Sequence, residues 1–182
     1  MRDTGEALLR DYLDALAQGP RPVRVVEKGN YWHQRLADAL LRAVTLGGQD
    51  RYLSEYVTTL GHTIYVPDGW SERSPLARYT VLRHEVVHVR QFERWGWAGM
   101  VLLYGLLPFP VGLAYGRARL EWEAYAETLR VTAEVYGLDA ACDPRLHEEI
   151  IGRFTGPDYA WMWPFPSMVR GWIAAELTEL QR

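Results

Sequence analysis

Apolar residues recur at steps of three and four along much of this chain, the spacing that one face of an α-helix requires. The strongest example runs from Leu76 to Trp95 without an internal Gly or Pro. Ser74-Pro75 before this stretch is typical of a helix start, and Gly96 after it is typical of a helix end. The apolar positions are Leu76, Tyr79, Leu82, Val86, Val89 and Phe92. We therefore predict an amphipathic helix over 76–95.

A second helical pattern covers Arg117 to Tyr136 and ends at Gly137. Its apolar stripe consists of Trp122, Ala126, Leu129, Ala133 and Tyr136. We predict four further helices, over Thr4–Gln18, Tyr31–Thr45, Pro144–Phe154 and Ser167–Leu180.

Stretches that are rich in β-branched and aromatic residues predict strands instead. They cover Val23–Glu27, Tyr52–Leu60 and His62–Pro67, and Gly61 separates the last two. With 182 residues, 48% of them hydrophobic, the chain is long enough for one domain with a large core. We predict a single α+β domain over residues 1–182. We expect it to be mostly helical, with a small antiparallel or mixed sheet beside helix 76–95.

Charge and composition then limit the classes of function. The net charge is -3 and no basic patch with interleaved aromatic residues is visible, which argues against a general nucleic-acid binder. Cys142 is the single cysteine, so we expect no intrachain disulfide and a reducing compartment. Residues 1–18 lack the apolar run of a signal peptide, and we therefore expect a cytoplasmic protein. The preference for Arg over Lys favours a GC-rich or thermophilic source, and we expect a bacterial one.

The candidate chemistry lies in helix 76–95, which contains His84-Glu85-Val86-Val87-His88, an H-E-x-x-H pattern. Residues four apart on a helix lie one turn above each other on the same face. Both imidazoles can therefore bind one Zn²⁺, with Glu85 beside them as the candidate general base.

Catalytic zinc normally takes three protein ligands, so a third one is needed. The residues after His88 lack the H-E-x-x-H-x-x-G-x-x-H spacing, which excludes the metzincin pattern. Helix 117–136 offers Glu121 and Glu123, which point to opposite flanks of its apolar stripe. The Glu123 flank is charged and we expect it to be solvated, whereas the Glu121 flank carries no other charge. Because an isolated carboxylate needs a cation, we favour Glu121 and keep Glu123 as the alternative.

H-E-x-x-H followed by a Glu on a later helix resembles the gluzincin arrangement of thermolysin-like enzymes, small minimal gluzincins and HtpX heat-shock membrane proteases. Residues 121–125, Glu-Trp-Glu-Ala-Tyr, resemble the E-x-x-A-D or E-x-x-A-N element of several of those families. Tyr125 replaces the usual Asp or Asn, and its hydroxyl is a candidate for part of the hydrogen bonding to a zinc-bound His. The resemblance covers about residues 60–137. It implies a zincin-like fold and a zinc site formed by His84, His88 and Glu121.

Residues 95–116 carry no charge, which raises the question of a membrane span. Several Gly and Pro residues interrupt this stretch. A single crossing would also separate Glu121 from both histidines, and too few residues remain for a helical hairpin. We therefore predict no transmembrane span, but a buried helix followed by a loop. The alternative is an apolar hairpin that lies at a membrane interface or acts as a lid.

We predict a zinc-dependent metalloendopeptidase that acts on a peptide or protein, with Glu85 transferring a proton from the attacking water to the leaving amine. In zincins a strand at the edge of the cleft pairs with extended substrate, and His62–Pro67 resembles it; an ordinary strand of the sheet is the alternative. The aromatic stretch Tyr159–Pro166 either lines the cleft or packs over the core. Two other functions stay open: a zincin-like zinc protein with a structural or regulatory role, and a metal-free interaction module that uses residues 95–116.

Overall fold

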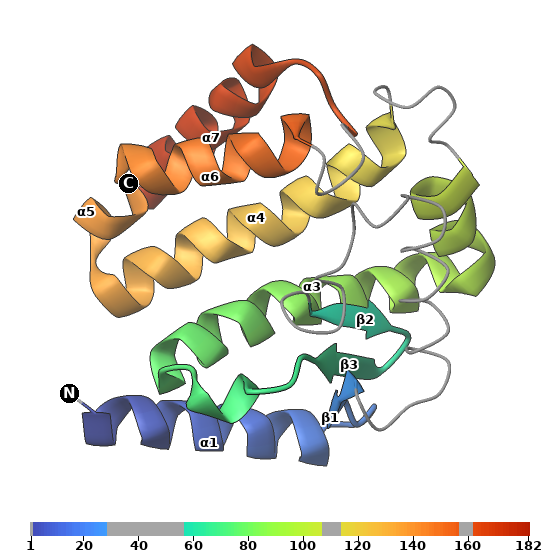
Figure 1. Ribbon diagram of the computed structural model, residues 1–182, viewed down its shortest axis with the longest axis vertical. Coiled ribbons are helices and arrows are strands. Elements are labelled where there is room, and N and C mark those ends of the chain that lie inside the picture. Colours follow the sequence, from blue (N-terminus) through green and yellow to red (C-terminus); the bar gives the residue numbers. More distant parts are fainter. Residues whose placement is uncertain (1, 29–56, 107–113, 157–161) are drawn as a thin grey trace. The chain divides into compact units, whose positions relative to one another are not determined.

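The computed structural model describes residues 2–28, 57–106, 114–156 and 162–182 (Figure 1). The chain divides into two compact units, residues 1–85 and 86–182, and helix α3 (Pro75–Met100) runs through the boundary between them. The predicted helix Tyr31–Thr45 and most of the predicted strand Tyr52–Leu60 lie outside the described residues. The assignment of residues 1–182 to a single domain stays a prediction.

The first unit combines helix α1 (Arg2–Gln18) with a three-stranded mixed sheet. Strands β1 (Arg24–Glu27) and β3 (Thr63–Val66) pair in parallel, with Val25 opposite Ile64. Strand β2 (Thr58–Leu60) pairs with β3 in the antiparallel direction, with Thr59 opposite Ile64. The short helix η2 (Trp70–Glu72) then leads towards α3. A mostly helical α+β fold with a small mixed sheet is therefore confirmed.

The position of β3 decides between the two interpretations of His62–Pro67. The sheet order is β1-β3-β2, so the segment His62–Pro67 forms the central strand and not an edge that could pair with substrate. Ile64, Tyr65 and Val66 are all buried. The physical reason is that Val25 and Val26 in β1 occupy the second edge of β3, a pairing between distant segments that the local pattern does not reveal.

Helix α3 begins where the sequence predicts. Pro75 is its first residue, and the hydroxyl of Ser74 accepts a hydrogen bond of 3.3 Å from the backbone N–H of Ala77. This bond satisfies one of the N–H groups that a helix start leaves without a partner inside the helix. The buried face is formed by Tyr79, Leu82, Val86 and Val89. The predicted apolar stripe therefore faces the interior.

Gly96 interrupts α3 without ending it. Its φ of 63° and ψ of 178° break the helix, a backbone conformation that is essentially restricted to Gly. The chain then resumes helical geometry to Met100 and continues as a π-helix, η3 (Val101–Leu106). The predicted helix end is therefore a kink.

The prediction of a buried helix after residue 95 is wrong. Met100 is buried, but Trp95, Trp97, Val101 and Leu102 are between 45% and 59% exposed. A helix that is apolar on every side can bury only the face that meets a neighbour, and the remaining apolar residues stay on the surface. No helix among the described residues is both long enough and apolar enough to cross a bilayer.

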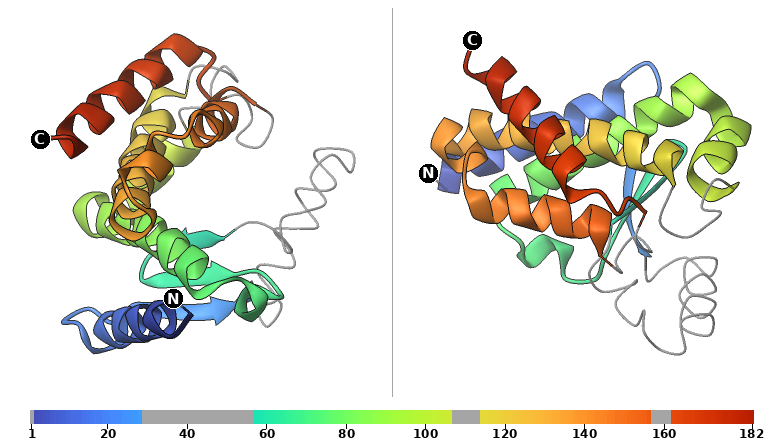
Figure 2. Two further views of the ribbon diagram at one scale, coloured as in Figure 1. Left: turned by 90° about the vertical axis from the view of Figure 1, so that its left-hand side faces the viewer. Right: turned by 90° about the horizontal axis from the view of Figure 1, so that it is seen from above.

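The second unit is helical, and α4 (Tyr115–Tyr136) is its longest complete helix. It ends at Gly137, which has a φ of 93°, as predicted. Helices α5 (Leu138–Ala141), α6 (Pro144–Thr155) and α7 (Pro166–Leu180) follow, and α6 and α7 pack with α4 (Figure 2). The core includes Trp122, Ala126, Leu129, Ile150, Phe154, Met162, Trp163, Val169 and Ile173. Met162 and Trp163 of the aromatic stretch therefore pack into this core.

Candidate metal centre

The structure places the three predicted metal ligands together. One ligand atom from each of His84, His88 and Glu121 lies within 4.8 Å of the others. Both histidines are on α3, four residues apart, so helix geometry alone sets them on one face. Glu121 extends from α4, and its side chain is only 1% exposed. The sequence thus predicts the membership of this cluster.

The two ring nitrogens of His88 have different neighbours. Its Nε2 lies 3.8 Å from Oε2 of Glu121. Its Nδ1 lies 2.9 Å from Oε1 of Gln91, which is three residues further along α3. Gln91 is itself only 2% exposed. One ring nitrogen therefore faces the candidate third ligand, and the other is held by an amide.

Glu123 differs from its predicted surroundings. It is half-buried, and its Oε2 accepts a hydrogen bond of 2.9 Å from Nε2 of Gln91. Arg119, Arg130 and Glu134 on this flank are exposed as predicted, but Glu123 itself is partly covered because Gln91 on α3 contacts it. Glu121 is the carboxylate in the ligand cluster, and Glu123 contacts the amide behind His88.

Tyr125, which replaces the usual Asp or Asn, is half-buried. Its ring packs against Phe154 with ring centroids 5.6 Å apart, next to the core of the second unit. Gln91 makes a contact to Nδ1 of His88. Sequence reasoning missed this role, although helical spacing does place Gln91 on the same face as both histidines.

Glu85 is buried and oriented by the sheet. The hydroxyl of Thr59 on β2 donates a hydrogen bond of 2.7 Å to Oε2 of Glu85. Thr59 is 9% exposed and Glu85 is 7% exposed, so this bond is well shielded from water. The two residues are 26 positions apart, and no local sequence pattern indicates their contact. The sheet therefore fixes the carboxylate that neighbours His84 on the helix.

The donor set fits a zinc ion. Two imidazole nitrogens and one carboxylate oxygen are ligands that zinc commonly takes, with bonds of about 2.0–2.1 Å. A tetrahedral site with such bonds separates its ligand atoms by about 3.3–3.5 Å. The present separations, 3.8 Å between His88 and Glu121 and at most 4.8 Å within the cluster, are somewhat longer than in such a site.

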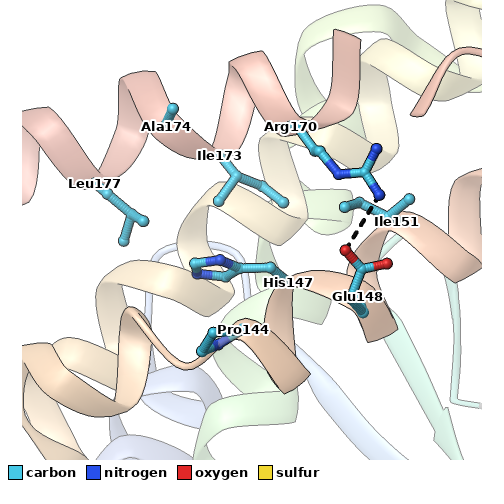
Figure 3. A pocket seen from close by; sticks show the side chains of 8 residues that line it. All are labelled: Pro144, His147, Glu148, Ile151, Arg170, Ile173, Ala174 and Leu177. Carbon is cyan, nitrogen blue, oxygen red and sulfur yellow. Dashed lines mark hydrogen bonds and ion pairs between the residues drawn. The ribbon is translucent and has the colours of Figure 1, made fainter. Parts of the chain in front are cut away.

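A surface groove between α6 and α7 offers much less chemistry (Figure 3). Its residues include Ile151, Ile173 and Leu177. Nε2 of His147 lies 2.8 Å from the carbonyl oxygen of Ala141. Arg170 and Glu148 form an ion pair of 3.2 Å, and Figure 3 shows this pair beside the apolar lining. The polar groups of the groove already bind protein atoms, so the ligand cluster is the stronger candidate site.

Comparisons with protein-family models, with curated proteins and with solved structures give no match for this chain. The functional conclusion therefore rests on the residues and on the geometry of the three ligands.

Proposed function

We propose that this protein is a zinc-dependent metalloendopeptidase of gluzincin type. The observation that carries the proposal is the convergence of His84, His88 and Glu121 to within 4.8 Å, next to a buried Glu85 on the same helix as the histidines. This is the combination of ligands and general base that the H-E-x-x-H pattern requires.

Each residue has a defined task in peptide hydrolysis. His84, His88 and Glu121 would hold the zinc, which supplies Lewis acidity that activates water and polarises the scissile carbonyl. Glu85 accepts a proton from the attacking water at its carboxylate and then donates that proton to the nitrogen of the leaving amine. Thr59 supports this step, because its hydroxyl holds Oε2 of Glu85 in one orientation.

The number of ligands favours catalysis over a structural role. Structural zinc sites are almost always closed by four protein ligands, whereas catalytic sites use three and leave one position open. Within the part of the chain that the structure describes, the cluster has three members. A regulatory or structural zinc protein is therefore the second candidate.

The test combines metal analysis with turnover. We expect about one zinc per chain in the wild type, and almost none after combined His84→Ala and His88→Ala substitution. Glu85→Gln should retain zinc and lose cleavage of a peptide library by orders of magnitude, because an amide cannot accept the proton. A protein that binds no zinc after loading would refute the zinc site. Equal cleavage by the wild type and Glu85→Gln would refute the role of Glu85.

A further inference from the structure

We propose that Gln91 is a positioning residue that fixes which nitrogen of His88 carries the proton, and that Glu123 holds the Gln91 amide in the required orientation. This inference rests on the proposed zinc site and explains how one of its ligands is prepared for a metal. All four residues involved, His88, Gln91, Leu120 and Glu123, belong to the second unit.

The first step concerns the direction of the Gln91 amide. Its Nε2 donates to the carbonyl oxygen of Leu120 at 2.9 Å and to Oε2 of Glu123 at 2.9 Å. Both partners are acceptors only, and one of them is a carboxylate. A flipped amide would place Oε1 against both oxygens and lose two hydrogen bonds, one of them charge-assisted. The bond to Leu120 is buried, so water cannot replace it there.

The second step concerns the tautomer of His88. With Nε2 of Gln91 directed at two acceptors, Oε1 is the atom that faces Nδ1 of His88 at 2.9 Å. An amide oxygen can only accept, so Nδ1 must carry the hydrogen. Neutral imidazole then presents its lone pair at Nε2, the nitrogen that lies 3.8 Å from Glu121. The lone pair therefore faces the third ligand.

The third step concerns the spacing of the ligands. Leu120 immediately precedes Glu121, so the bond from Gln91 to the Leu120 carbonyl also fixes the turn of α4 that carries the third ligand. A single amide thus contacts one ligand directly and the backbone next to another. Partners of this kind typically change metal affinity by 10–100-fold when they are lost.

The experiment compares Gln91→Met, which keeps the length of the side chain and removes both hydrogen-bonding atoms, with Glu123→Ala, which removes one anchor of the amide. Thr132→Val serves as the control, because it replaces another buried polar residue of α4 at similar volume. Zinc affinity is measured by chelator competition on the full chain. Long-range ¹H–¹⁵N NMR spectra of the metal-free protein report which ring nitrogen of His88 is protonated.

We expect the wild type to show His88 protonated at Nδ1 and free of hydrogen at Nε2. Gln91→Met should lose this preference and bind zinc about 10–100-fold more weakly. Glu123→Ala should weaken the tautomer preference and the zinc affinity less. Thr132→Val should show the tautomer and the zinc affinity of the wild type. Unchanged tautomer and zinc affinity in Gln91→Met would overturn the inference while leaving the zinc site intact. If Gln91→Met fails to fold, an unchanged tautomer and zinc affinity in Glu123→Ala overturn it. If the wild type binds no zinc, the proposed function fails, and the NMR spectra still decide the tautomer.

Discussion

Thr59→Val should destabilise the metal-free protein by about 1.5–3 kcal/mol, the usual contribution of a hydrogen bond to a charged group. The hydroxyl of Thr59 lies 2.7 Å from Oε2 of Glu85, and both residues are less than a tenth exposed. Val has nearly the volume of Thr, so the substitution removes the donor without opening a cavity. The Glu85 carboxylate then lacks one hydrogen-bond donor, and water does not replace that donor because the site is buried.

Urea denaturation of the metal-free protein measures this loss without a contribution from bound zinc. Thr59→Ser keeps the hydroxyl and removes one methyl group, so it should cost only about 0.8 kcal/mol. In a Glu85→Gln background the same Thr59→Val change should cost about 0.5–1.5 kcal/mol, because the acceptor is then neutral. Our reasoning is refuted if Thr59→Val is as stable as the wild type, or if Thr59→Ser loses as much stability as Thr59→Val.

Two further substitutions test the ligand set and the kink in α3. Glu121→Ala should weaken zinc binding by at least about tenfold in chelator competition. The control is Glu127→Ala, which removes a carboxylate paired with Arg130 on the same helix. This control should bind zinc with the affinity of the wild type. Equal affinities in the two variants would remove Glu121 from the ligand set. Gly96→Ala should lower the free energy of unfolding by about 1–3 kcal/mol through backbone strain alone, since an added Cβ meets nothing within 4 Å. Gly152→Ala is the control, because Gly152 lies in the middle of α6 with equally open surroundings, and it should stabilise the protein by about 0.5–1 kcal/mol. A similar change in the free energy of unfolding for both variants would show that Ala adopts the backbone conformation of Gly96 without strain.

Local patterns in the sequence predict much of this fold because they act over a few residues. Ser74-Pro75 starts α3, Gly137 ends α4, and the four-residue spacing of His84 and His88 sets their common face. Helical periodicity also identifies the buried face of α3, since the positions that repeat every three or four residues are the ones that face the interior.

The remaining features depend on contacts between distant segments. Strand alternation in 62–67 does not reveal whether a second strand covers its other edge, and β1 does so. Helical geometry places Glu123 on a flank of α4, but it does not indicate that Gln91, 32 residues earlier, reaches that flank. The sequence also does not predict the exposure of Trp97. An uncharged segment is buried only as far as neighbouring elements cover it.

The bond from Gln91 to the carbonyl oxygen of Leu120 has a consequence for how this site tolerates substitution. Every residue type supplies a backbone carbonyl, so exchange of Leu120 for another apolar residue of similar size leaves this acceptor in place. Gln91 supplies an acceptor and a donor from one side chain, whereas the ionised carboxylate of Glu, which has the same length, only accepts. We therefore expect random mutagenesis, selected for zinc binding, to recover many apolar residues at position 120 and almost exclusively Gln at position 91.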